Sequence, residues 1–458
     1  MYAGGYLSDH LNMSVSPFQS VAAGAGILFL FLVVSRTPDF IGIAGVALLV
    51  GLVALIAIGL SGGMAKSVTS KPGLFFIAFT IWLCVCLPFS VWKGGSFELI
   101  KDTWSRSLLA FIIVGGSLVT LGHLRKALFT MAVAAIAILG LAFKFASAES
   151  GRLAFIQGTL ANPNDMAAYL LMTVPFCLFV FMESRNGFVK AGMAIVSLML
   201  LVMTLRTGSR SGLVNIGILG AYMFFTASFR KKLLMGTVAL AMVVAAPLYL
   251  TDSVIGRFRT MVEDNVASHS GSTDPQDRQT DFAEASTQSR AQLFRKSVEI
   301  TLANPVLGVG PGMFAVASSD LAKLEGDRAQ WQQTHNTFTQ VSSETGLPGL
   351  LIFLGLVFTI FRATRTPKEW ADSPDPEIRL LSNVGYCLRL ALISFCGGGL
   401  FGSLAYGMQL PILGGLAETL RRTLESRRQQ PQAPAVVRPP ARRAAPVRPL
   451  AAARRMRA

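Results

Sequence analysis

Repeated apolar runs of about 20 residues constrain the fold of this chain more than any other feature. A helix needs roughly 20 mostly apolar residues to cross the hydrocarbon core of a bilayer. At 52% hydrophobic and 14% charged residues, the composition also excludes a soluble globular protein. We therefore expect an all-α polytopic membrane protein with about twelve transmembrane helices. The candidate spans are 18–35, 40–61, 73–92, 107–122, 128–146, 166–184, 189–206, 211–228, 233–250, 347–364, 383–404 and 406–420.

Two polar segments stand out from this pattern. Residues 251–345 carry twelve acidic and eight basic side chains, which predicts one large loop outside the membrane with short amphipathic helices. Residues 421–458 hold eleven arginines and one glutamate, and this Pro/Ala/Arg-rich tail cannot bury enough apolar surface to fold. The expected units are thus transmembrane helices in 1–146, a membrane domain with its loop in 147–420, and a disordered tail in 421–458.

The charge distribution predicts the orientation of the helices. The chain has a net charge of +16, and a basic tail could bind nucleic acid. A basic segment beside a membrane more often marks the cytoplasmic side and touches anionic lipid, so we expect no nucleic-acid partner. With both termini in the cytoplasm, the basic clusters between spans face inward and the loops 93–106, 147–165, 207–210 and 251–345 face outward. Arg36 is an exception, a basic residue on the outer side.

Arginines recur on the outer side of the membrane, against the topological bias. Snorkelling at helix ends would explain an isolated case. A repeated pattern favours a polyanion site, because guanidinium groups suit phosphate oxygens better than ammonium groups do. The candidates are Arg152, Arg206, Arg210, Arg290 and Arg295.

Two short motifs flank predicted spans. The segment 158–165 reads Gly-Thr-Leu-Ala-Asn-Pro-Asn-Asp, in which Asn162 or Asn164 could cap the following helix. The segment 207–212 reads Thr-Gly-Ser-Arg-Ser-Gly and joins two spans with almost no loop. An arginine held there is costly unless paired, so Arg210 is a functional candidate.

A third motif lies in the polar loop. Residues 287–303 follow an amphipathic pattern, with Leu293, Phe294, Val298 and Leu302 on one face and Pro305 as the stop. The glycines at 308, 310 and 312 do not form a dinucleotide fingerprint, because no strand precedes them. They predict a tight turn pressed against the membrane domain.

The fourth motif is Thr334-His335-Asn336, followed after nine residues by Gly346-Leu347-Pro348-Gly349. It lies where loop, water and bilayer would meet. A histidine there can handle a proton, since its pKa lies near neutral pH. Capping of the next helix is the simpler alternative.

In this order and on this side of the membrane, the four motifs resemble the O-antigen ligase / O-antigen polymerase superfamily of bacterial envelope proteins. The resemblance is clearest over about 150–365. The His-Asn pair, the nine-residue gap and the Gly-x-x-Gly turn match the motif of the ligase branch. The tail and the first spans lie outside the resemblance.

The resemblance implies a glycosyltransferase in the bacterial inner membrane, with its active site at the periplasmic face. The donor would be a glycan on undecaprenyl diphosphate, and the acceptor a sugar hydroxyl of lipid A–core or of a growing glycan. His335 would be the catalytic base and Arg210 and Arg290 the main diphosphate clamp. Further diphosphate-binding candidates are Arg206, Arg152 and Arg295, and the supporting residues are Asn336, Asp165 and Glu344.

We expect no cofactor and no metal, because arginines could replace a divalent ion on the leaving diphosphate. Asp165 and Glu344 are the carboxylates that could instead orient His335 or act as base. Helix capping of Asp165 and solvation of Glu344 are their simpler explanations.

Other functional classes remain open. Twelve spans with both ends inside also fit a flippase or another transporter of lipid-linked oligosaccharide. No repeat relates the two halves, however, and the charges gather at one face rather than at the midplane. A structural subunit would not need a histidine–arginine constellation. Within the enzyme class, ligase and polymerase are both possible, and the His-Asn motif favours ligase.

Overall fold

The computed structural model describes residues 16–43, 45–148, 151–156, 158, 160–259, 275–324 and 331–429. Helices dominate these residues, which confirms the predicted all-α class. The described part also contains a small antiparallel pair of strands, β1 (Ala146–Ser147) and β2 (Ala154–Phe155).

Within the described residues, eight helices are long and apolar enough to cross a membrane. They support a multi-pass membrane protein, and the figure of twelve spans stays a prediction. Exposed apolar side chains such as Leu48, Phe225, Leu248 and Leu351 suit contact with lipid. The eight are α1 (Pro17–Ser35), α5 (Lys71–Cys86) with its 3₁₀ extension η1 (Leu87–Phe89), α8 (Leu121–Phe145), α9 (Pro163–Glu183), α10 (Gly187–Arg206), α12 (Phe229–Tyr249), α16 (Thr337–Ala363) and α17 (Pro376–Gly399).

The remaining predicted spans also overlap helices, which are shorter or less apolar. These are α3 (Gly45–Leu60), α7 (Ser105–Ser117), α11 (Arg210–Thr226) and α18 (Gln409–Gln429). Connecting elements are α2 (Thr37–Phe40), α4 (Gly63–Val68), α6 (Lys93–Glu98), the π-helical turn η2 (Leu99–Trp104), α13 (Asp252–Arg259), α14 (Pro275–Ala303), α15 (Phe314–Leu324) and the 3₁₀ turn η3 (Lys368–Asp372).

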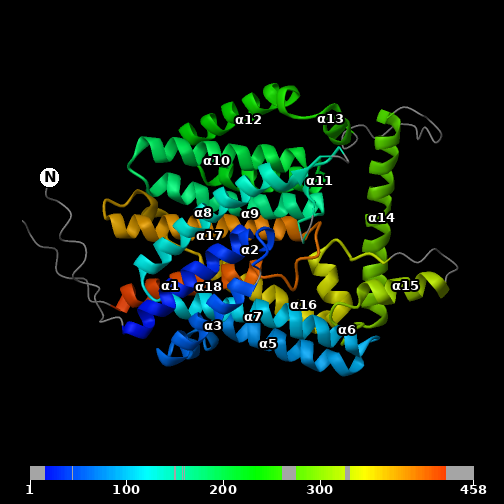
Figure 1. Cartoon of the computed structure of the whole chain (residues 1–458), viewed down its shortest axis with the longest axis horizontal. Coiled ribbons are helices and arrows are strands. Elements are labelled where there is room, and N and C mark those ends of the chain that lie inside the picture. Colours follow the sequence, from blue (N-terminus) through cyan, green and yellow to red (C-terminus); the bar gives the residue numbers. More distant parts are fainter. Residues whose placement is uncertain are drawn as a thin grey trace, which may run out of the picture.

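The helix bundle has two distinct ends (Figure 1). The long helices run side by side, with α9 packed against α8, α10 and α17, and α14 crosses their ends at the right of the view. The beginning of α1 and the end of α18 lie at the left, away from α14. A core of aromatic side chains joins α5, α7 and α16, with ring centroids 4.4 Å apart for Phe76–Phe111 and 5.7 Å for Phe79–Phe353.

The described parts of the predicted polar loop contain more helix than expected. Its helix α14 is 29 residues long rather than short, and α16 begins at Thr337, with a kink at Gly346 directly before the predicted span start at residue 347. Asn336 makes the early start possible, because its side chain accepts hydrogen bonds from the backbone of Phe338 and Thr339. Residues 260–274 and 325–330 of this segment lie outside the described residues.

The buried face of α14 differs from the predicted one. Leu293 is buried, but Phe294, Val298 and Leu302 are exposed. The buried face instead runs through Ser297, Ile300 and Thr301, which reaches Ser342 of α16 in a 2.9 Å hydroxyl contact. The sequence pattern marked the apolar side chains, whereas α14 packs against α16 through a partly polar stripe.

The glycine-rich turn after α14 packs directly on α16, as predicted. The backbone amide of Val309 donates to the carbonyl of Ser343, and that of Gly310 donates to the carbonyl of Glu344, both at 2.9 Å. Gly346 has φ +72° and interrupts the helical geometry of α16 at this contact. The Gly-x-x-Gly motif therefore shapes a backbone-to-backbone joint between the loop and the membrane domain.

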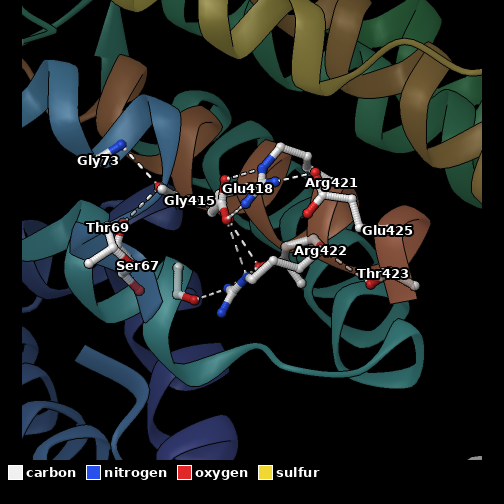
Figure 2. A network of polar contacts seen from close by, with 12 residues as sticks. Ser67, Thr69, Gly73, Gly415, Glu418, Arg421, Arg422, Thr423 and Glu425 are labelled. Atoms are coloured by element: carbon white, nitrogen blue, oxygen red, sulfur yellow. Dashed lines mark hydrogen bonds and ion pairs between the residues drawn. The ribbon is translucent and has the colours of Figure 1, made fainter. Parts of the chain in front are cut away.

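An ion-pair network fixes α18 at the far end of the bundle (Figure 2). Glu418 is fully buried and accepts hydrogen bonds from Arg421 at 2.7 and 2.9 Å, with Arg422 beside it at 3.5 Å. The helix consequently continues to Gln429, past the predicted start of the disordered tail at residue 421. Residues 430–458 of that tail lie outside the described residues.

Candidate functional site

A cavity of about 760 Å³ opens between α1, α9, the π-helical turn η2 and the segments before α16 and α18. Two of the sequence-predicted site residues, His335 and Asp165, line it together. Part of its wall is apolar, with Met131, Met172 and Phe176. A cavity of this size with a few polar groups suits a small-molecule or glycan-sized ligand.

His335 is held by its backbone at the wall of this cavity. Its amide donates to the hydroxyl of Ser403 at 3.2 Å, and its φ is +50°, a conformation that non-glycine residues rarely adopt. The neighbouring Asn336 caps α16 and also donates from its side chain to the carbonyl of Leu400 at 3.1 Å. Asn336 therefore caps the helix, and His335 lines the cavity.

The electrostatic surroundings of His335 favour its neutral form. Burial, and then the positive charge of Arg290, lower the pKa of His335 from its ordinary value of 6.5. A neutral imidazole at physiological pH can accept a proton, which is the property a general base requires.

Four arginines gather beside the cavity. Three of them, Arg152, Arg210 and Arg290, were predicted, and the fourth is Arg257 of α13. Burial, and then repulsion from the other three, lowers the pKa of Arg152 to about 10. Burial and repulsion within the group also lower the pKa values of Arg257 and Arg290. We call these four residues the arginine cluster.

Hydrogen bonds join the predicted motifs within the arginine cluster. Arg152 donates from Nε to the carbonyl of Thr207 at 2.9 Å and from Nη2 to Oδ1 of Asn164 at 3.1 Å. The same Asn164 oxygen accepts from the hydroxyl of Ser209 at 2.8 Å. The segments 158–165 and 207–212 therefore form one polar wall, although they lie far apart in the sequence.

Arg257 extends this wall from a third segment. Its backbone carbonyl accepts a hydrogen bond from Nε of Arg210 at 3.2 Å. Arg257 follows the 233–250 span on the predicted outer side. An arginine at the outer end of a span is the signal that identified the other candidates, and it could have identified Arg257 as well. It was missed because the polar loop carries many charges and no motif surrounds this one.

Arg290 connects the arginine cluster to the cavity. Its charge lowers the pKa of His335, and the carboxylate of Asp165 raises the pKa of Arg290 in turn. Cation, carboxylate and imidazole therefore lie within electrostatic reach of one another. Asp165 occupies the first turn of α9, where Asn162 supplies the cap by accepting a hydrogen bond from Asn164.

Two predicted arginines are not brought into the cluster. In the described part of the chain, neither the Arg206 nor the Arg295 guanidinium makes a hydrogen bond or an ion pair, and Arg295 is exposed on α14. Arg206 contributes its backbone carbonyl, which accepts from the amide of Leu153 at 3.1 Å.

Glu344 has a different place from the predicted one. It is fully buried instead of solvated, and its Oε2 accepts from the Gly312 amide at 2.8 Å and from the Tyr406 hydroxyl at 2.6 Å. Tyr406 lines the cavity, whereas no hydrogen bond between described residues links Glu344 to His335. Glu344 therefore links the glycine-rich turn, through Gly312, to Tyr406 in the cavity wall.

The described residues contain no group of three or more His, Cys, Asp or Glu side chains that could hold a metal ion. The positive charge at the site comes from guanidinium groups.

Residues 194–354 match the protein-family model described as O-antigen ligase. The match begins within α10 and ends within α16, so it includes Arg210, Arg257, Arg290 and His335. This finding confirms the family resemblance that the motifs predicted, and it identifies a region of the O-antigen ligase family in a multi-pass membrane protein. No curated protein is a detectable match for the chain.

Proposed function

We propose that this protein is a membrane glycosyltransferase that moves a glycan from undecaprenyl diphosphate to a sugar hydroxyl at the periplasmic face. The observation that carries the proposal is the arginine cluster, whose Arg290 acts electrostatically on His335 at the wall of a cavity large enough for sugar residues. The family match supports lipid-linked glycans as the substrate class.

The arginine cluster has the chemistry required for the leaving group. Breaking the bond between the anomeric carbon and the diphosphate leaves negative charge on phosphate oxygens, and cations in a partly dry site stabilise that charge most strongly. Even with its lowered pKa of about 10, Arg152 stays protonated at neutral pH. A bound diphosphate would offset the mutual repulsion that the four guanidinium groups otherwise experience.

His335 supplies the complementary step. The acceptor hydroxyl oxygen forms the new bond to the anomeric carbon while its proton passes to the neutral imidazole. The lowered pKa of His335 keeps the imidazole deprotonated before the reaction. Arg290 lies within electrostatic reach of His335 and belongs to the cluster, so base and leaving-group site are close enough to act on one donor.

The site's place in the bundle supports the proposed orientation in a bacterial inner membrane. The start of α1 and the end of α18 lie at the end away from α14, which agrees with two cytoplasmic termini and a periplasmic site (Figure 1). A reporter fused after residue 430 should be active only in the cytoplasm, and one inserted near Ser270 only in the periplasm. Both reporters on one side would contradict this orientation.

The transfer itself can be tested with purified full-length protein in lipid vesicles. Given a glycan on undecaprenyl diphosphate and a lipid A–core acceptor, the protein should release undecaprenyl diphosphate only when the acceptor is present. Release that depends instead on a second donor molecule would make the protein a polymerase, the alternative within the same superfamily. Movement of intact donor across the vesicle, without any bond broken, would make it a flippase and contradict the proposal.

A further inference from the structure

Arg36 is a further basic residue on the predicted outer side, and in the structure it lines the cavity. It lines the same cavity as His335 and ends α1 with φ +57°. Among the described residues, Arg36 and His335 are the two non-glycine residues with positive φ. Glycine or asparagine is usual at such a helix end, and strained backbone positions gather at functional sites.

A second arginine reaches the cavity from the first turn of α7, directly after the π-helical turn η2. Arg106 lines the cavity together with Asp102 and Thr103 of η2. A π turn inside a longer helix is rare and is frequent at functional sites. The turn η2 is held against α5, because Trp104 is buried and donates from Nε1 to the hydroxyl of Thr80 at 2.9 Å.

Three of the four arginines and aspartates that line the cavity have an opposite charge nearby. Asp165 lies in the field of Arg290, Asp102 is 3.7 Å from Lys101, and Arg36 pairs with Asp39 at 2.9 Å. Arg106 has no ion-pair partner in the described part of the chain. Both arginines lie outside the segment that matches the O-antigen ligase family model.

We propose that Arg36 and Arg106 form a second anion site in the cavity, which holds a phosphate or carboxylate group of the acceptor glycan. The proposal rests on the proposed function, in which the arginine cluster takes the donor diphosphate. While the arginine cluster holds the diphosphate, the acceptor must bring its hydroxyl to the anomeric carbon, so we expect it to occupy a part of the cavity away from that cluster. Asp102 and Thr103 offer hydrogen-bond partners for sugar hydroxyls beside the anionic group.

Binding measurements on the full-length protein in detergent test this site. The probes are glucose 6-phosphate, glucuronate, glucose and undecaprenyl diphosphate, each titrated against wild type, Arg36→Gln and Arg106→Gln. We expect at least one anionic sugar to bind about tenfold more tightly than glucose, because it gains charge-assisted hydrogen bonds. Each substitution should weaken that binding by about three- to tenfold, less for the exposed Arg106, and leave undecaprenyl diphosphate unaffected.

Two control variants separate this role from structural and general charge effects. Asp39→Asn removes the ion pair of Arg36 but keeps the guanidinium, and should retain binding of the anionic sugar. Arg230→Gln removes an exposed arginine at the start of α12 and should also retain it. Thermal unfolding checks each variant, and Arg106→Gln on its exposed position keeps the test decisive if Arg36→Gln does not fold.

The outcomes distinguish the sources of the anion. Anionic sugars that bind wild type no better than glucose would overturn the second site. Loss of undecaprenyl diphosphate binding in Arg36→Gln and Arg106→Gln would assign both residues to the donor and overturn it as well. Undecaprenyl diphosphate that binds wild type and Arg290→Gln equally would contradict the proposed function, while the sugar-phosphate titration still decides whether the second site exists.

Discussion

Two groups of partly buried arginines lie at opposite ends of the bundle, and their charge balance differs. At one end, Glu418 accepts hydrogen bonds from Arg421, which raise the pKa of that arginine (Figure 2). At the other end, burial and mutual repulsion lower the pKa of Arg152 to about 10. The first group is neutralised within the protein, whereas the second concentrates positive charge beside a cavity.

The difference shows how the same residue type serves stability in one place and ligand binding in another. Arg422 completes the first group, with hydrogen bonds to the carbonyls of Gly115 and Leu118 of the α7 end. These contacts tie α18 to its neighbour and need no ligand. In the arginine cluster, Asp165 offsets only part of the charge, so an anionic ligand would add stability that the protein alone lacks.

The largest expected effect is the loss of activity in His335→Ala. Removing a general base typically slows transfer by about 10²- to 10⁴-fold. Thermal unfolding should change little, because the contacts that hold residue 335 come from its backbone amide. His123→Ala in α8 at the opposite end is the matched control and should transfer glycan at the wild-type rate. Wild-type transfer by His335→Ala would remove the base from the mechanism.

Glu418→Ala should have the opposite profile. Taking away the buried carboxylate removes two hydrogen bonds of Arg421 and the ion pair of Arg422, and we expect a loss of about 3 kcal/mol in the free energy of unfolding. The folded fraction should keep its transfer rate. Glu425→Ala removes the half-exposed partner of Arg421 and should cost only about 0.5 kcal/mol. Equal stability of Glu418→Ala and wild type in chemical denaturation would contradict the structural role.

Arg290→Ala should lower transfer without destabilising the protein. It removes charge-assisted bonds worth about 1.5–3 kcal/mol, or about tenfold to 150-fold in rate, and it also relieves repulsion within the cluster. Lysine at this position should restore only part of the activity, since it keeps the charge but not the planar fork.

Arg295→Ala on the same helix is the control for Arg290, because its exposed side chain lies outside the cluster. We expect it to change donor affinity less than twofold, within the range of an exposed charge. A similar loss for both variants, measured as the KM for the lipid-linked donor, would mean that α14 contributes general attraction rather than a defined clamp.

The pH profile gives a smaller effect with a definite sign. A base must be deprotonated to act, so kcat/KM should rise with pH through the pKa of His335 and level off above it. Because burial and Arg290 lower that pKa, half-maximal activity should fall below pH 6.5. Arg290→Gln removes one of the two causes and should move the profile toward higher pH. A shift toward lower pH in this variant would show that another group limits the rate.

Chelation should have the smallest effect. If the arginine cluster neutralises the diphosphate, activity should persist in EDTA, in agreement with the prediction of a metal-independent enzyme. Activity that disappears in EDTA and returns with magnesium or manganese would exclude the arginine cluster as the sole source of positive charge. Asp165, which lines the cavity, would then be the first carboxylate to replace.

Local patterns predicted most of the helices and pointed to candidate site residues that lie near one another in the fold. The apolar runs marked each of the eight helices that are long and apolar enough to cross a membrane, and Arg152, Arg210 and Arg290 lie in one cluster that reaches His335 through Arg290. These residues could be found because each lies at a helix end on one side of the membrane, where topology limits the possible positions.

Other features depended on tertiary packing that a single sequence does not reveal. Glu344 was predicted as a supporting residue, with solvation in the polar loop as the simpler explanation, yet α16 starts early and buries it against Gly312 and Tyr406. Arg257 has no local motif and joins the cluster through its hydrogen bond with Arg210 across 47 positions. The continuation of α18 depends on Glu418, which pairs with Arg421 and Arg422. Both arginines belong to the segment that the sequence predicted as a disordered tail.

The joint between the glycine-rich turn and α16 limits how this region can evolve. A Cβ on Gly308 would lie 2.3 Å from the carbonyl carbon of Glu344, and one on Gly346 would lie 2.1 Å from the carbonyl oxygen of Val306. Both obstacles are main-chain atoms, which no second substitution can make smaller. Neither glycine can therefore be rescued by a compensating change in a neighbour, and lineages that diversify this loop would have to leave both positions untouched.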